Sequence, residues 1–200
     1  MAKIKLTKNE LKRQKDGLKR FVRYLPTLML KKQQLQLVIR QVVAEVVEKT
    51  REREAAFAEL TTWIAVFGEE TGIENLIRMT DLVTSAGNIA GVDIPVFERI
   101  TFDESRYDLF KTPLWLDQGL IALRTLISFD AEIEVLNRQR ERLDDELRIT
   151  TQRVNLFEKV KIPETKDNIR RIRIYLGDEQ TAAVVRGKIA KKNLLQDAAS

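Results

Sequence analysis

The sequence contains no cysteine and no histidine in its 200 residues. These absences exclude disulfide bonds, thiol nucleophiles and the usual zinc sites, and they remove the commonest general base. Aromatic residues make up only 6% of the chain, and no apolar run approaches the roughly 20 residues that a membrane-spanning helix needs. Carboxylates and lysines remain, so composition disfavours catalysis without excluding it. We expect no catalytic residue, no metal, no cofactor and no direct membrane insertion.

Charged residues, by contrast, make up 32% of the chain, and their signs are unevenly distributed. Residues 1–50 carry 13 Lys and Arg against 4 Asp and Glu, residues 151–200 carry 11 against 6, and residues 51–150 carry 11 against 20. A chain that folds back on itself would have one basic and one acidic pole. The Lys-rich start has no apolar segment after it, which predicts a cytoplasmic protein without a signal peptide.

Two long helical patterns flank a different central segment. The first begins at Thr7, which forms a capping box with Glu10, and runs to about Glu74; the second runs from Pro113 to about Lys192. Apolar residues recur in both at alternating steps of three and four, the seam of a coiled coil. They include Leu18, Phe21, Leu25, Leu28, Leu35, Ile39, Val42 and Val46 in the first, and Ile133, Leu136, Leu143, Leu147, Val154 and Phe157 in the second. The pattern predicts a mainly α fold, a long antiparallel two-helix coiled coil.

A single antiparallel register aligns the two seams. It places Val42 opposite Leu147 and Val46 opposite Leu143, and it brings Pro26 level with Pro163. Because proline removes a helical hydrogen bond and clashes with the preceding turn, the two prolines either break the helices or bend both together.

The central segment holds most of the turn formers and predicts a small insert at the turn end. Val92, Ile94 and Val96 alternate with polar residues or proline, and Ile100 and Phe102 continue the alternation, which indicates a β-hairpin. The apolar residues from Ile73 to Val83 allow a short helix in addition. The predicted domains are an N-terminal helix over 1–74, the insert over 75–113, a C-terminal helix over 114–192 and a flexible tail over 193–200.

Motifs for nucleotide chemistry are missing from the sequence. It has neither Gly-x-x-x-x-Gly-Lys-[Ser/Thr] nor Gly-x-Gly-x-x-Gly, and the acidic run Asp144–Glu146 is typical of a solvated helix face rather than of an acid/base pair. The basic ends are compatible with a coiled-coil adaptor that binds nucleic acid, but few aromatic residues are interleaved for base stacking. Lys32, Lys49, Arg53 and Arg140 interrupt the seams, either covering them with their aliphatic stems or marking a docking site.

Three segments resemble one known family. Arg153-Val154-Asn155-Leu156-Phe157-Glu158 with Ile162-Pro163, the basic run Arg186–Lys192, and Asn88-Ile89-Ala90-Gly91-Val92 before Pro95 are similar to the D-subunit family of the V/A-type rotary ATP synthases. The resemblance implies a non-catalytic central rotor shaft that couples ATP synthesis or hydrolysis to proton or sodium transport, and it disfavours nucleic acid as a partner.

The same resemblance implies the partners and where they bind. They are the catalytic A and non-catalytic B subunits of the ring, the small F subunit, and the subunit that caps the membrane ring, so the chain would be peripheral to the membrane through the complex. The shaft tip with Lys188, Lys191 and Lys192 would lie within the ring, and the seam cations Lys49, Arg53 and Arg140 are candidate contacts for the F subunit.

The missing phosphate-binding loop gives a first prediction. The purified chain should neither hydrolyse nor tightly bind Mg-ATP, and calorimetric titration should show no saturable heat. A site of micromolar affinity would contradict the assignment of nucleotide chemistry to partner subunits.

Overall fold

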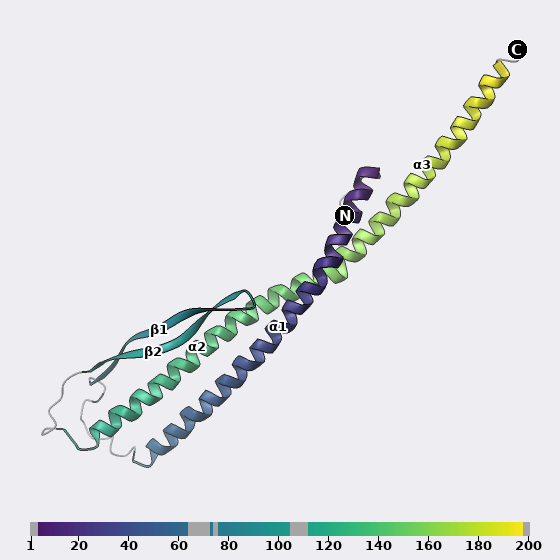
Figure 1. Cartoon of the computed structure of the whole chain (residues 1–200). Coiled ribbons are helices and arrows are strands. Elements are labelled where there is room, and N and C mark those ends of the chain that lie inside the picture. Colours follow the sequence, from purple (N-terminus) through teal and green to yellow (C-terminus); the bar gives the residue numbers. More distant parts are fainter. Residues whose placement is uncertain (1–3, 64–72, 74–75, 105–111, 198–200) are drawn as a thin grey trace. The chain divides into compact units, whose positions relative to one another are not determined.

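The computed structural model describes residues 4–63, 73, 76–104 and 112–197 (Figure 1). The elements are α1 (Lys8–Thr61), β1 (Ile77–Ile89), β2 (Val92–Glu104), α2 (Leu116–Asn155), the π-helical turn η3 (Leu156–Lys161) and α3 (Ile162–Asp197). The chain divides into two compact units. The terminal unit comprises residues 1–30 and 150–200, and the hairpin unit comprises residues 31–149. The mainly α class with a small two-stranded antiparallel insert is confirmed.

The start of α1 follows the predicted cap. The Thr7 hydroxyl accepts a hydrogen bond from the Glu10 N–H at 3.3 Å, satisfying one of the free donors of the first turn. The Glu10 carboxylate accepts from the Gln14 side chain at 2.8 Å instead of reaching back to Thr7. The cap is therefore one half of the predicted capping box.

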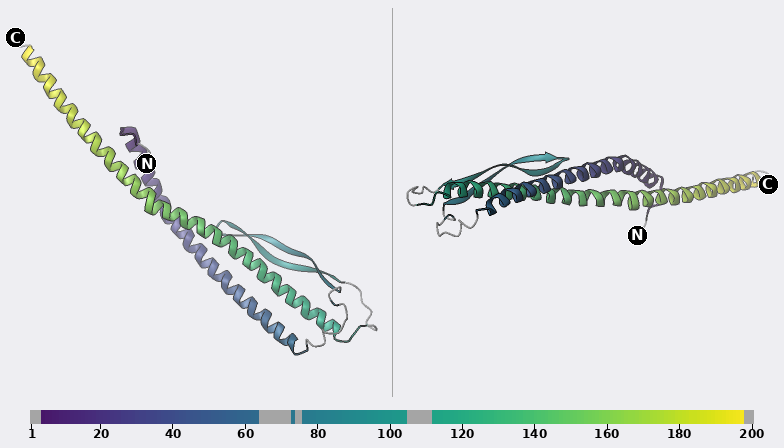
Figure 2. Two further views of the ribbon diagram at one scale, coloured as in Figure 1. Left: turned by 180° about the vertical axis from the view of Figure 1, so that it is seen from behind. Right: turned by 90° about the horizontal axis from the view of Figure 1, so that it is seen from below.

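The hairpin unit has a core made from three elements rather than two. Its buried cluster combines α1, β2 and α2 through Leu35, Val42, Ile94, Leu136 and Leu143. The hairpin lies along α2 in both orientations (Figures 1 and 2). Gln139 donates to the Pro95 carbonyl at 2.7 Å and Arg142 to the Asp93 carbonyl at 3.1 Å. The insert therefore folds back onto the coiled coil and completes its core.

The hairpin is longer than the sequence suggested. Residues Val92–Phe102 belong to the single strand β2, and it pairs with β1, which contains Ile77, Leu82 and Val83. The interpretation of those three residues as part of a short helix is wrong, because pairing with β2 determines their conformation. Ala90 and Gly91 form the turn with φ of 53° and 76°, the conformation that two-residue hairpin turns need and glycine supplies readily.

The predicted register of the two long helices is also wrong within the hairpin unit. It would place Lys49 opposite Arg140 and Arg53 opposite Leu136. In the structure, Lys49 pairs with Glu132 at 3.4 Å and Arg53 with Asp130 at 3.0 Å, so these partners lie eight and six residues earlier on α2. Lys31 pairs with Glu146 at 2.6 Å, a shift in the same direction. A seam with a seven-residue repeat stays apolar after such a slip, and the ion pairs favour the shifted alignment.

Neither helical proline ends its helix. Pro26 lies inside α1, and Pro163 is the second residue of α3 directly after η3. At that junction the Ile162 N–H donates to the Phe157 carbonyl, five residues earlier. This wider turn comes immediately before a residue that has no N–H to donate, and π-helical turns are a known way of absorbing such irregularities. The alternative that the two prolines break their helices is therefore excluded at both positions.

The helix ends differ from the predicted boundaries. α1 ends at Thr61, whereas the expected end near Glu74 lies outside the described residues. α3 continues to Asp197, so the tail expected from residue 193 begins as helix.

The three-element core gives the second prediction. Leu143→Ala should lower the free energy of unfolding by about 2–5 kcal/mol, because Leu143 is fully buried and its removal leaves a cavity. Urea denaturation measures the change. The matched control Leu37→Ala, on a side chain that is 59% exposed, should stay within about 0.5 kcal/mol of the wild type. Equal losses in the two variants would contradict the assigned core.

Candidate partner-binding surfaces

The C-terminal part of α3 is a helix without a packed face. All residues from Gly177 to Leu195 are exposed, and Lys188, Lys191 and Lys192 lie on this segment. It also exposes large apolar side chains, namely Val184, Val185, Ile189, Leu194 and Leu195. Helices in proteins take most of their stability from packing an apolar side, and apolar groups exposed together mark interaction surfaces. The predicted tip lysines therefore sit on a segment suited to contacting other proteins.

Lys49 and Arg53, two of the predicted partner contacts, are engaged within the hairpin unit. The Lys49 ammonium lies 3.1 Å from Glu52 and 3.4 Å from Glu132, and 5.8 Å from the centre of the Phe129 ring. The hydrogen bond to Glu52 raises the pKa of Lys49, and burial opposes this while Glu132 adds to it. Lys49 is therefore a firmly charged bridge between α1 and α2.

Arg53 makes a similar bridge one turn further along α1. Its guanidinium donates to both carboxylate oxygens of Asp130, from Nε at 3.0 Å and from Nη2 at 3.5 Å, and it lies 5.6 Å from the centre of the Phe57 ring. The two cations fasten the seam where the apolar pattern weakens. Their charges are already balanced by carboxylates of α2, and their role as partner contacts stays a prediction.

Arg140, the third predicted contact, is not brought together with the other two. It is half-buried on α2, eight residues beyond Glu132, and it makes no ion pair with any residue that the structure describes. Its neighbours Gln139 and Arg142 hold the carbonyls of β2. Sequence reasoning missed these two because nothing in the helical pattern shows that a strand packs there.

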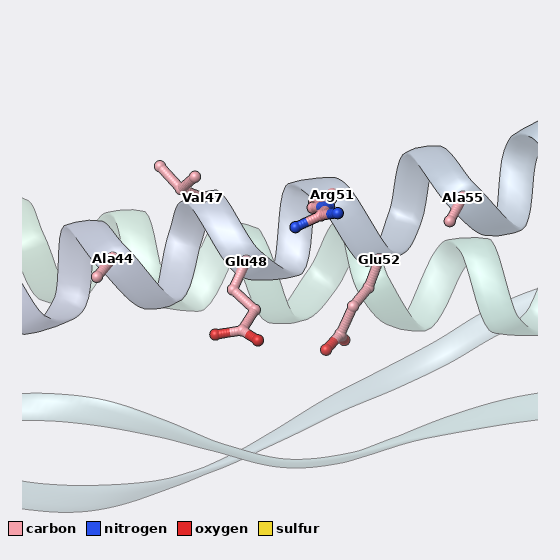
Figure 3. Close-up of a pocket in the computed structure, with 6 residues that line it drawn as sticks. All are labelled: Ala44, Val47, Glu48, Arg51, Glu52 and Ala55. Carbon is pink, nitrogen blue, oxygen red and sulfur yellow. The ribbon is translucent and has the colours of Figure 1, made fainter.

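A shallow groove follows one side of α1 in the hairpin unit (Figure 3). Its residues recur at helical spacing, and Glu48 and Glu52 project in the same direction from neighbouring turns. The small side chains of Ala44 and Ala55 leave room for close approach of another backbone, while Val47 adds apolar surface. Such a surface can accept a helix.

Clusters of metal-ligating side chains and membrane-spanning helices are both absent from the described part of the chain. Across residues 4–63, 76–104 and 112–197, no group of three or more Asp and Glu side chains is arranged to hold a metal ion. In the same ranges, no helix is both long and apolar enough to cross a bilayer.

Comparison with known proteins gives a consistent result over nearly the whole chain. Residues 10–192 match the family model that describes the D subunit of ATP synthase. The V-type ATP synthase D subunit of Borreliella burgdorferi is 50% identical over 196 residues, covering 98% of this chain and 97% of that protein. The proteins of the same name from Chlamydia felis and Chlamydia trachomatis serovar L2 are 37% and 35% identical, each over 98% of this chain and 95% and 98% of their own length. The chain therefore belongs to the family of ATP synthase D subunits.

Proposed function

We propose that this chain is the central rotor shaft of a V/A-type rotary ATPase, coupling ATP synthesis or hydrolysis in a catalytic ring to proton or sodium transport through a membrane rotor. The observation that carries the proposal is family membership over nearly the full length, joined to a long helix end with no packed face. As an ATP synthase D subunit it is a non-catalytic member of a complex, and other subunits are its partners.

The specific partners follow from the same proposal. The exposed part of α3 enters a ring of catalytic A and non-catalytic B subunits, while the F subunit and the subunit that caps the membrane ring bind elsewhere on the shaft. The chain is then cytoplasmic and peripheral to the membrane through the complex. Nucleotide binding belongs to the ring, which agrees with the lack of a phosphate-binding loop in this sequence.

The charge distribution suits a part that turns. A rotor must release each contact with the ring at every step, so strong contacts at one angle would stall it. Exposed ion pairs contribute only about 0.2–1 kcal/mol each, so contacts made by such charges can be released at every step. Lys188, Lys191 and Lys192 supply charges of this kind, since none of them forms an ion pair in the described part of the chain.

We infer the contact with the F subunit from how the three seam cations Lys49, Arg53 and Arg140 are paired. Lys49 and Arg53 are held by carboxylates of α2, whereas Arg140 keeps an uncompensated charge beside the hairpin. We therefore propose Arg140 as the stronger of the candidate contacts with the F subunit.

Reconstitution of the complex tests the proposed rotor-shaft function. Co-expressed with the ring and membrane subunits, the full chain should co-purify with them and support coupled ATPase activity and ion pumping. Deleting residues 187–200 should weaken assembly or reduce pumping per ATP hydrolysed, because it removes about half of the unpacked helix together with the three tip lysines. Failure of the full chain to enter the complex would contradict the proposed rotor-shaft function.

Single tip lysines should matter little. Lys188→Ala, Lys191→Ala and Lys192→Ala should each leave the ATPase rate within about fivefold of the wild type, because one exposed pair contributes at most about 1 kcal/mol. The measurement is ATPase rate together with ion pumping on assembled complexes. Loss of hydrolysis in one of these variants with assembly intact would argue for a specific catalytic contact instead of a bearing.

A further inference from the structure

A second basic surface lies in the terminal unit, away from the tip lysines. It is a groove of about 380 Å³ between the start of α1 and the middle of α3. Its floor is apolar and is formed by Leu18 and Ile169. Five cations line it, namely Lys15, Lys19, Lys166, Arg170 and Arg173.

The two helices are held together at this level by apolar contacts. The rings of Phe21 and Phe157 lie 5.2 Å apart between centroids at an angle of 54°, and Ile169 and Ile172 are buried. The cations therefore project from a supported pair of helices. Their positions recur at helical spacing, i and i+4 on α1 and i, i+4 and i+7 on α3, so each set lies along one side of its helix.

The groove carries charge that the chain itself does not balance. None of its five cations forms an ion pair with a described residue, and no carboxylate lines the groove. The nearby Arg13 and Arg171, by contrast, are paired with Glu10 and Asp167. Like charges gathered without counter-charges repel one another, and an anionic occupant relieves that repulsion.

We propose that this basic groove binds an acidic, amphipathic helical segment of a partner protein. The carboxylates of the segment would pair with the cations, and its apolar side chains would cover Leu18 and Ile169. The proposal deepens the proposed function and rests on it, because the partner is taken to be another subunit of the same complex.

The composition of the groove favours a peptide over a nucleic acid. A nucleic-acid backbone pairs with cations but does not bury an apolar surface. Proteins that bind single-stranded nucleic acids also provide aromatic side chains on which the bases stack. No aromatic side chain lines the groove, and Phe21 is already packed against Phe157. An amphipathic helix uses both the charges and the floor.

The experiment measures fluorescence anisotropy of a labelled helical peptide titrated with the full chain. The peptide carries glutamates at i, i+4 and i+7 with leucines between them, and a second peptide has glutamine in place of every glutamate. We expect saturable binding of the acidic peptide that weakens as salt is raised. The glutamine peptide should not bind.

Two double variants locate the binding. Lys19→Gln with Arg170→Gln should weaken peptide affinity about three- to tenfold, the range expected for the loss of two exposed ion pairs. Arg20→Gln with Arg171→Gln removes the same charge from positions that do not line the groove, and it should leave affinity unchanged. Circular dichroism checks that both variants keep their helix content. Equal weakening in the two variants would overturn the proposal, because binding would then follow net charge alone.

A single-stranded oligonucleotide of matched charge tests the alternative that the groove binds nucleic acid. If it binds and the acidic peptide does not, the groove is a nucleic-acid site and the proposal is wrong; if neither binds, the proposal is equally wrong. Co-purification of the wild-type chain with ring subunits is measured in parallel. If the wild-type chain assembles but shows no groove-dependent binding, the peptide-binding proposal is wrong and the rotor-shaft proposal is unaffected. If the wild-type chain does not assemble, the rotor-shaft proposal is wrong.

Discussion

The apolar seam between α1 and α2 is the interaction on which the hairpin unit depends, and two helices alone cannot bury it completely. A helix pair leaves the sides of its seam open to water, since each helix covers only one side of the other. Here Ile94 of β2 joins Leu35, Val42, Leu136 and Leu143 in one buried cluster. The hairpin is therefore part of the core, and Gln139 and Arg142 fix it in place through the β2 carbonyls.

Ion pairs determine the register of α1 against α2, which the apolar seam alone does not define. An apolar pattern with a seven-residue repeat permits several alignments that bury nearly the same area. Opposing Lys49 to Arg140 would have cost energy through repulsion, whereas the observed alignment brings Lys49 to Glu132 and Arg53 to Asp130. Individually such pairs contribute little, but a small difference is enough to choose between alignments that are otherwise equal.

The sequence was sufficient for the helical class, the cap at Thr7 and the presence of a hairpin, because each depends on local periodicity or a short motif. It was insufficient for the register, since the seam repeats, and for β1, since Ile77, Leu82 and Val83 take their conformation from pairing with β2. The contacts of Gln139 and Arg142 could not be predicted for the same reason. They depend on where the hairpin packs, and no local pattern records that.

Two sets of cations among the described residues have different surroundings. Lys31, Lys49 and Arg53 point to carboxylates across the seam and are satisfied within the fold. The cations of the basic groove and of the end of α3 have no such partners among the described residues. Folding gains nothing from leaving like charges together, so these cations do not stabilise the fold in the way that the paired ones do. The distribution of paired and unpaired cations thus separates the surfaces whose charges the fold itself balances from the basic groove and the end of α3, whose charges the described residues do not balance.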